Sequence, residues 1–81
     1  MPNRTQHNKL TATQNRHRLG RHARLRAEVA YALHSTPIQY ACIYRRIEQA
    51  NQFKRGWNSV TDIDIDVAVK RTQIEEIHHE S

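Results

Sequence analysis

The stretch that decides the fold class is SVTDIDIDVAVKRTQIEEIHH, residues 59–79, because it carries two competing periodicities. From position 62 to 69 the residues alternate between aspartate or alanine and a branched apolar residue, which is the pattern of a half-buried strand. The same stretch has an apolar stripe at helical spacing, formed by Ile63, Val67, Ile74 and Ile77.

A helix is the better interpretation of residues 59–79. Ser59 and Thr61 are both suitable N-caps, each is followed three residues later by an aspartate, and basic residues come after the acidic first turns. A strand at residues 62–70 would need a partner, and the rest of the chain contains no good second strand. We therefore expect an all-α fold. The alternative is an α+β fold in which residues 62–70 pair with a second copy or with another protein's sheet edge.

A long helix is predicted from about residue 14 to 33, with Thr13 as its N-cap. Gly20 weakens this helix, and the cations near its start oppose the helix dipole. Arg18 falls on the apolar stripe, so we expect the first turns, residues 14–21, to extend beyond the core and to fray unless a polyanion binds. The stripe expected to face the core comprises His22, Leu25, Val29, Ala32 and Leu33.

A second helix is predicted to start at Thr36, with Pro37 in its first turn and Gln39 completing a capping box. It runs to about Phe53, and Gly56 has the residue type that ends helices in a left-handed conformation. Trp57 is then placed to fold back over the last turn. The expected core stripe is Tyr40, Ile43, Tyr44, Ile47 and Ala50.

Three helices joined by short turns predict a small three-helix bundle, which resembles a helix-turn-helix domain at most at the level of fold. Residues 1–13 are rich in Asn, Gln and Thr, and they contain too few apolar side chains to offset their ordering entropy. We expect a flexible basic arm at residues 1–13, followed by one small helical domain at residues 14–81.

Charge is distributed unevenly along the 81 residues. Residues 1–26 contain seven Lys or Arg and no acid, whereas residues 59–81 contain two cations and six acids. Such a gradient, with Arg in excess over Lys, indicates a polyanionic partner. The candidate nucleic-acid-binding residues are Arg16, Arg18, Arg21, Arg24, Arg26, Arg45, Arg46, Lys54 and Arg55.

Several function classes find no support in the sequence. A chain of 81 residues has little room for a catalytic pocket, and it lacks a phosphate-binding glycine loop or a nucleophile motif, so we expect no enzyme and no cofactor. One cysteine and no spaced histidine set predict no metal site. The longest apolar runs are only a few residues, which predicts no membrane contact. A single cysteine fits a reducing cytoplasm.

These observations favour a small non-catalytic protein that binds DNA or RNA through its arginine-rich N-terminal helix and acts as an accessory or regulatory factor, for example in transcription. The alternative is a protein-interaction module, such as a phage-type or host-type inhibitor or adaptor that acts on a nucleic-acid enzyme. A ribosome-associated protein is a third hypothesis. In each case the partners expected are macromolecules, with no small-molecule substrate.

Overall fold

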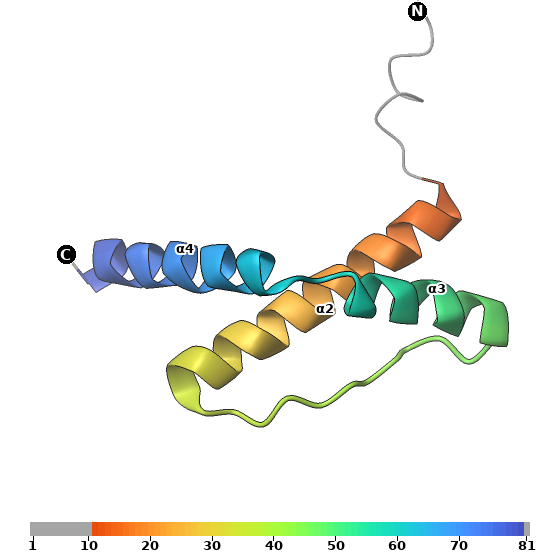
Figure 1. The fold of residues 1–81 in the computed structure, drawn as a ribbon, viewed down its shortest axis with the longest axis horizontal. Helices are drawn as coiled ribbons and strands as arrows, with labels where there is room; N and C mark the ends of the chain where they lie inside the picture. The colour runs from red at the N-terminus through yellow and green to blue at the C-terminus, as the bar shows by residue number, and fades with distance from the viewer. Residues whose placement is uncertain (1–10, 81) are drawn as a thin grey trace, which may run out of the picture.

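The computed structural model describes the backbone of residues 11–80 and the side chains of residues 11–76. It contains three helices, α2 (Ala12–His34), α3 (Ile47–Asn58) and α4 (Asp62–Glu80), and no strand within the described backbone (Figure 1). The all-α prediction is confirmed, and the α+β alternative is wrong. Residues 1–10 of the predicted flexible arm lie outside the described residues.

Helix α2 begins two residues earlier than expected because Thr11 caps it. The Thr11 side chain accepts a hydrogen bond from the backbone N–H of Gln14 at 3.1 Å, and the Gln14 side chain accepts one from the N–H of Thr11 at 3.0 Å. This reciprocal capping box satisfies two backbone donors that have no partner within the helix. Thr13, the predicted cap, lies inside the helix. The capping box therefore stabilises the first turn, which the sequence analysis expected to fray.

The predicted second helix is wrong over residues 37–46, where the chain is extended and α3 starts only at Ile47. The reason lies at the end of α2. Ser35 adopts a left-handed conformation with φ 56°, and its N–H bonds to the carbonyl of Tyr31 at 3.0 Å. The N–H of Thr36 bonds to the carbonyl of Ala30 at 3.3 Å. Thr36 thus completes the end of α2 and does not start a new helix.

The extended segment is also held by its aromatic residues. The Tyr40 ring meets Trp57 edge-on with ring centroids 5.1 Å apart, and its centroid lies 6.0 Å from that of Phe53. Tyr44 contacts Phe53 at the same distance, 6.0 Å. The predicted core stripe of Tyr40, Ile43, Tyr44, Ile47 and Ala50 is therefore wrong: Tyr40, Ile43 and Ile47 are 45%, 76% and 78% exposed. Tyr44 is half-buried, and both tyrosines reach α3 from outside it. Packing between segments has overridden a favourable local capping signal.

Helices α2 and α3 cross at a pair of glycines. A Cβ on Gly20 would overlap the carbonyl oxygen of Phe53, and a Cβ on Gly56 would overlap the carbonyl oxygen of His17. Gly56 is therefore not the left-handed end of the helix, as its residue type suggested; neither glycine has positive φ, and α3 continues to Asn58. Both glycines allow the two backbones to touch.

The core is small and lies beside this crossing. Its buried apolar residues are Phe53, Trp57 and Val60, which are 4%, 8% and 9% exposed. Phe53 and Trp57 come from α3, and Val60 follows it in the connection to α4. Trp57 is buried as expected, although it faces α2 from within the helix and does not fold back over a turn.

Helix α4 is capped by Thr61, one of the two predicted caps. Its side chain accepts a hydrogen bond from the N–H of Asp64 at 3.2 Å, and Asp64 accepts one from the N–H of Thr61 at 3.0 Å. The predicted core stripe is wrong, because its described members are exposed and the side chain of Ile77 lies outside the described residues. Exposed fractions are 76%, 49% and 56% for Ile63, Val67 and Ile74.

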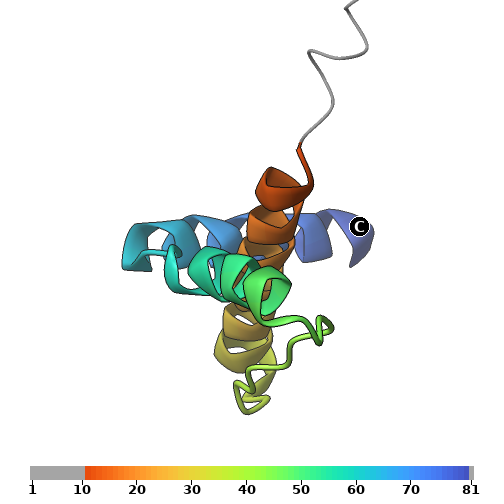
Figure 2. The ribbon, with the colours of Figure 1, turned by 90° about the vertical axis from the view of Figure 1, so that its right-hand side faces the viewer.

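Helix α4 packs against α2. On the opposite face of α4, Ala68 and Thr72 line a hollow together with Leu25 and Val29 of α2. Leu25 and Val29 belong to the stripe that the sequence analysis assigned to the core, and both are only half-buried. His22 and Ala32 of the same stripe are exposed, so that prediction is wrong for them. Helices α3 and α4 extend from the middle of α2 in different directions (Figures 1 and 2). In the described part of the chain α2 packs against both, and they do not pack against each other. No helix there has an apolar stretch long enough to cross a membrane.

Candidate nucleic-acid interface

Two of the nine candidate cations form ion pairs with carboxylates among the described side chains. Arg21 on α2 donates a hydrogen bond to Asp64 on α4 at 3.1 Å. Arg24 forms an ion pair with Glu28 at 2.8 Å, lies 5.6 Å from the centroid of the Trp57 ring, and donates to the Trp57 carbonyl at 3.4 Å. These two side chains connect α2 to α4 and to α3.

Asp64 shows the electrostatic effect of this arrangement. The hydrogen bond from Arg21 is the largest influence, and hydrogen bonds from the backbone and side chain of Thr61 add to it. Together they lower the pKa of the Asp64 carboxyl from 3.8 to about 2. Each of these donors favours the ionised carboxylate. Asp64 therefore both caps α4 and anchors it to α2.

Arg16 is positioned by neutral groups. Its guanidinium donates a hydrogen bond to the side-chain oxygen of Gln52 on α3 at 2.7 Å, and it lies 5.8 Å from the centroid of the Tyr44 ring. No carboxylate pairs with it among the described side chains. Arg16 thus keeps its full positive charge in a fixed place at the edge of the α2–α3 crossing.

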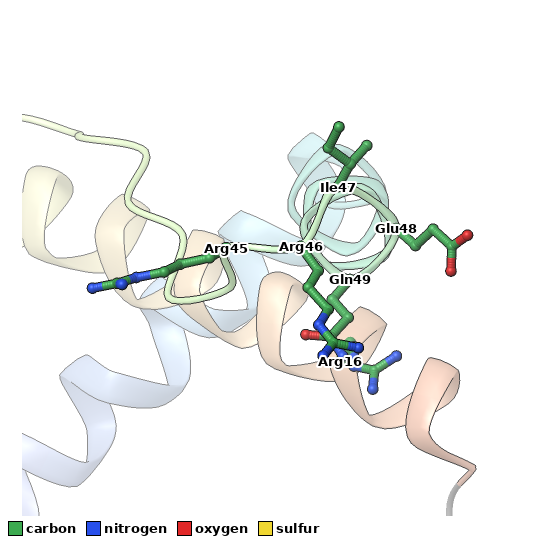
Figure 3. A pocket seen from close by; sticks show the side chains of 6 residues that line it. All are labelled: Arg16, Arg45, Arg46, Ile47, Glu48 and Gln49. Carbon is green, nitrogen blue, oxygen red and sulfur yellow. The ribbon is translucent and has the colours of Figure 1, made fainter.

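Arg16 belongs to a hollow of about 750 Å³ at the N-terminus of α3, which we call the arginine hollow. In Figure 3 the side chains of Arg16 and Arg46 extend to the same side, next to Gln49, while Arg45 extends away from them. Ile47 and Glu48 point in other directions. The residues that line the hollow are Arg16, Arg45, Arg46, Ile47, Glu48 and Gln49.

The start of α3 adds further positive potential to the arginine hollow. Arg46 is the N-cap residue, and it makes no side-chain capping hydrogen bond. The first N–H groups of the helix have no partner within it and carry the positive end of its dipole. Within residues 11–76 none of the three arginines forms an ion pair. Like charges are thus gathered beside free N–H donors, an arrangement that suits a phosphate group.

The remaining candidate cations lie elsewhere. Arg18 and Arg26 are exposed on α2, and Arg26 lines a separate hollow between α2 and α4. Lys54 and Arg55 are exposed on α3. The sequence analysis grouped Arg16 with the other arginines of α2. In the structure, Arg16 instead lines one hollow with Arg45 and Arg46 at the start of α3.

The sequence analysis missed the two glutamines that accompany the arginines. Gln52 positions Arg16 from 36 residues away, and Gln49 lines the arginine hollow. No local pattern links residues so far apart, so the sequence carries no signal for this contact. The described side chains include no group of three or more His, Cys, Asp or Glu that would hold a metal ion. The side chains of His78 and His79 lie outside the described set.

Comparison with known proteins identifies a family for this chain. Residues 10–80 match the family described as Phage Mu gene product 18. The match extends over most of the 81 residues and includes all three helices, so the chain belongs to this phage family. No curated protein and no solved structure matches it.

Proposed function

Starting from its membership of a phage family, we propose that this chain is a small non-catalytic protein that binds the phosphate backbone of DNA or RNA. The arginine hollow is the observation that carries the proposal. Arg16 and Arg46 extend to one side of the α3 N-terminus, and no acidic side chain pairs with them in residues 11–76. Two neighbouring guanidinium groups repel each other, and a bound phosphate removes that cost.

The charge distribution supports a polyanion as the ligand. The first 26 residues contain seven cations and no acid, and Lys54 and Arg55 add exposed charge along α3. Phosphate contacts of this kind position a protein on nucleic acid and do not read its sequence. The proposal therefore covers the backbone contact, with the arginine hollow as its centre.

A second candidate is a protein-interaction module that acts on a nucleic-acid enzyme. The exposed isoleucines favour it, because Ile43 and Ile47 are 76% and 78% exposed at the start of α3. Exposed apolar residues of this size mark binding surfaces when they are grouped. In this second candidate function, the arginines contact acidic side chains of the partner protein.

The experiment that tests nucleic-acid binding measures affinity for a DNA duplex and for RNA as a function of salt. Two arginine–phosphate contacts, from Arg16 and Arg46, predict a slope of log K against log salt near −1.8 on duplex DNA, or about a 12-fold loss between roughly 50 and 200 mM salt. We expect Arg46→Gln to reduce the magnitude of the slope by about one. Arg46 is exposed and unpaired in the described structure, so circular dichroism should show an unchanged fold.

The matched control removes one charge from another place. Arg71 lies on α4, away from the arginine hollow. The affinity of Arg71→Gln is therefore compared with that of the single variant Arg46→Gln. Affinity should fall clearly more for Arg46→Gln. Equal losses would show that only net charge matters, and no binding to either nucleic acid at low salt would contradict the proposal.

A further inference from the structure

The side of α2 that faces away from α3 carries a row of basic residues. Arg18, His22 and Arg26 are the exposed residues of α2 between positions 15 and 30. At 3.6 residues per turn they lie about 160°, 200° and 240° around the helix axis from Gly20, which marks the contact with α3. We call these three residues the basic ridge, and eight residues of helix give it a length of about 12 Å.

The basic ridge keeps its charge because the ion pairs of α2 lie elsewhere on the helix. Glu28 pairs with Arg24, and Asp64 pairs with Arg21. These two arginines lie about 40° and 100° around α2 from Gly20, nearer to α3 than the ridge is. Neither arginine of the ridge pairs with a carboxylate among the described side chains. The ridge is therefore a surface that attracts an anion.

An apolar hollow of about 320 Å³ opens beside the basic ridge, between α2 and α4. Its described lining combines His22 and Arg26 of the ridge with apolar side chains from both helices, and it contains no acid. The apolar residues are Leu25, Val29 and Ala68. Sites for small ligands have volumes of roughly 300–1,000 Å³ and a similar mixture of apolar walls and a few polar groups. This lining suits a ligand that joins an anionic group to a compact apolar body.

Thr72 contributes the side-chain oxygen of the described lining. Its hydroxyl donates a hydrogen bond to the carbonyl of Ala68 at 2.9 Å, so its oxygen is left as an acceptor. An acceptor beside apolar walls suits a ligand that brings an N–H donor of its own. The hydrocarbon chain of a fatty acid has no such donor, whereas the edge of a nucleobase has one.

A nucleotide in a single strand meets all of these requirements. Its phosphate is the anion, its base is compact with apolar faces, and the edge of the base carries N–H donors. In a duplex the bases are paired and stacked, so the entry of one base into the hollow would cost free energy that a single strand does not lose. The described lining contains no Phe, Tyr or Trp, so aliphatic contacts hold the base and we expect little preference among the bases.

We propose that the hollow between α2 and α4 binds one unpaired base of single-stranded DNA or RNA, while the basic ridge binds phosphates of the same strand. This inference rests on the proposed binding of nucleic acid, and it adds a second site and a type of strand. The hollow shares no lining residue with the arginine hollow at the start of α3. The two sites can therefore be tested separately.

The first test compares a short single-stranded DNA with an abasic strand that has the same number of phosphates. Affinities of the full chain for the two end-labelled strands are measured by fluorescence anisotropy at low salt. We expect the strand with bases to bind about fivefold more tightly or better, the low end of what one stacked base contributes. Equal affinities would overturn the proposal.

A variant that fills the hollow locates this preference. Ala68→Leu should bring the ratio of the two affinities close to one and leave the affinity for the abasic strand unchanged. The matched control is Ala32→Leu, which adds the same atoms at an exposed position of α2 outside the hollow and should keep the wild-type ratio. A wild-type ratio in Ala68→Leu would overturn the proposal.

A second variant avoids a change of volume. Thr72→Val keeps the shape of the side chain and removes the acceptor oxygen, so it should lower the ratio about twofold or more. Circular dichroism checks that both hollow variants remain helical.

A photo-cross-link shows directly where the base lies. A single strand with one 4-thiothymidine should cross-link within residues 22–29 or 68–72, as identified by mass spectrometry of the peptides. Cross-links confined to the start of α3 would overturn the proposal.

Arg46→Gln separates this proposal from the proposed function. The variant should weaken the binding of both strands equally and leave their ratio unchanged. If Arg46→Gln changes neither affinity while Ala68→Leu removes the preference, the arginine hollow is wrong and the base site stands. The reverse pattern overturns the base site alone, and no binding of either strand overturns both.

Discussion

The two faces of α2 make contacts of very different closeness. Toward α3, Gly20 and Gly56 let the backbones touch, and the neighbouring Phe53 and Trp57 are buried. Toward α4, the contact is made by half-buried side chains such as Leu25, and it leaves a hollow of about 320 Å³. The face with Gly20 is thus packed more tightly than the face with Leu25 and Val29. The close approach of α2 and α3 depends on the lack of a side chain at Gly20 and Gly56 more than on apolar side chains.

The arginines do not prevent this close contact, because they lie along its edges. The Arg24 guanidinium stacks 5.6 Å from the centre of the Trp57 ring, and Arg16 lies 5.8 Å from the centre of the Tyr44 ring. An arginine covers apolar surface with its aliphatic stem and keeps its charge at the surface. An arginine-rich helix face can therefore form part of a helix crossing.

The largest effect is expected at the crossing itself. Gly20→Ala should destabilise the protein by about 3 kcal/mol or more, because the new Cβ meets the Phe53 carbonyl and the helices must separate. At an ordinary helix position the same change would stabilise by about 1 kcal/mol. The sign of the change in unfolding free energy, measured by urea denaturation, tests the close contact directly.

The matched control places an alanine on the outer side of the crossing. Asn51 is exposed on α3, so Asn51→Ala meets nothing on α2 and should leave stability unchanged or slightly higher. Gly56→Ala should behave like Gly20→Ala. A stable Gly20→Ala variant would mean that α2 and α3 do not approach at these glycines.

A smaller effect is expected on the α4 side. Leu25→Ala should cost about 1 kcal/mol, well below the loss typical of a fully buried leucine, because Leu25 is half-buried beside a hollow. Hydrogen exchange should show faster opening of α4 than of α3 in the wild type, and Leu25→Ala should increase the difference. Equal protection of α3 and α4 would contradict the comparison.

The smallest effect concerns the ion pair between α2 and α4. The pKa of Asp64 is about 2 in the folded protein and 3.8 without its partners, so the unfolded state binds more protons between these values. The stabilisation is present above pH 4 and is lost as the pH falls toward 2. The melting temperature of Asp64→Asn should fall less over this range than that of the wild type. Asp62→Asn, which changes an exposed neighbour, is the control.

The helices were predictable where the signals are local. The capping pair Thr61 and Asp64 supports the start of α4 in the sequence as it does in the structure. Thr36 shows where such reasoning fails, because its N–H is already bonded to Ala30 at the end of α2. A capping motif does not say which of two neighbouring helices it serves.

The candidate site was predictable in its residue types but not in its grouping. The arginines stood out in the sequence, yet the contact between Arg16 and Gln52 depends on how α2 and α3 cross. That crossing is set by Gly20 and Gly56. From the sequence, Gly20 was expected to weaken its helix and Gly56 to end one. A glycine required for close approach looks the same in a sequence as a glycine required for flexibility.

The glycine crossing also has a consequence for the speed of folding. Gly20 and Gly56 are 36 residues apart, and the chain between them includes the extended stretch at residues 37–46. Closing a loop of this length costs conformational entropy before any contact at the crossing can form. The glycines have no side chains with which to make an early, approximate contact, so the crossing offers little stabilisation until the two helices are fully aligned. The rate-limiting step should therefore be the docking of α3 onto α2, with most contacts of the crossing formed after it, and Phe53→Leu should speed unfolding more than it slows folding.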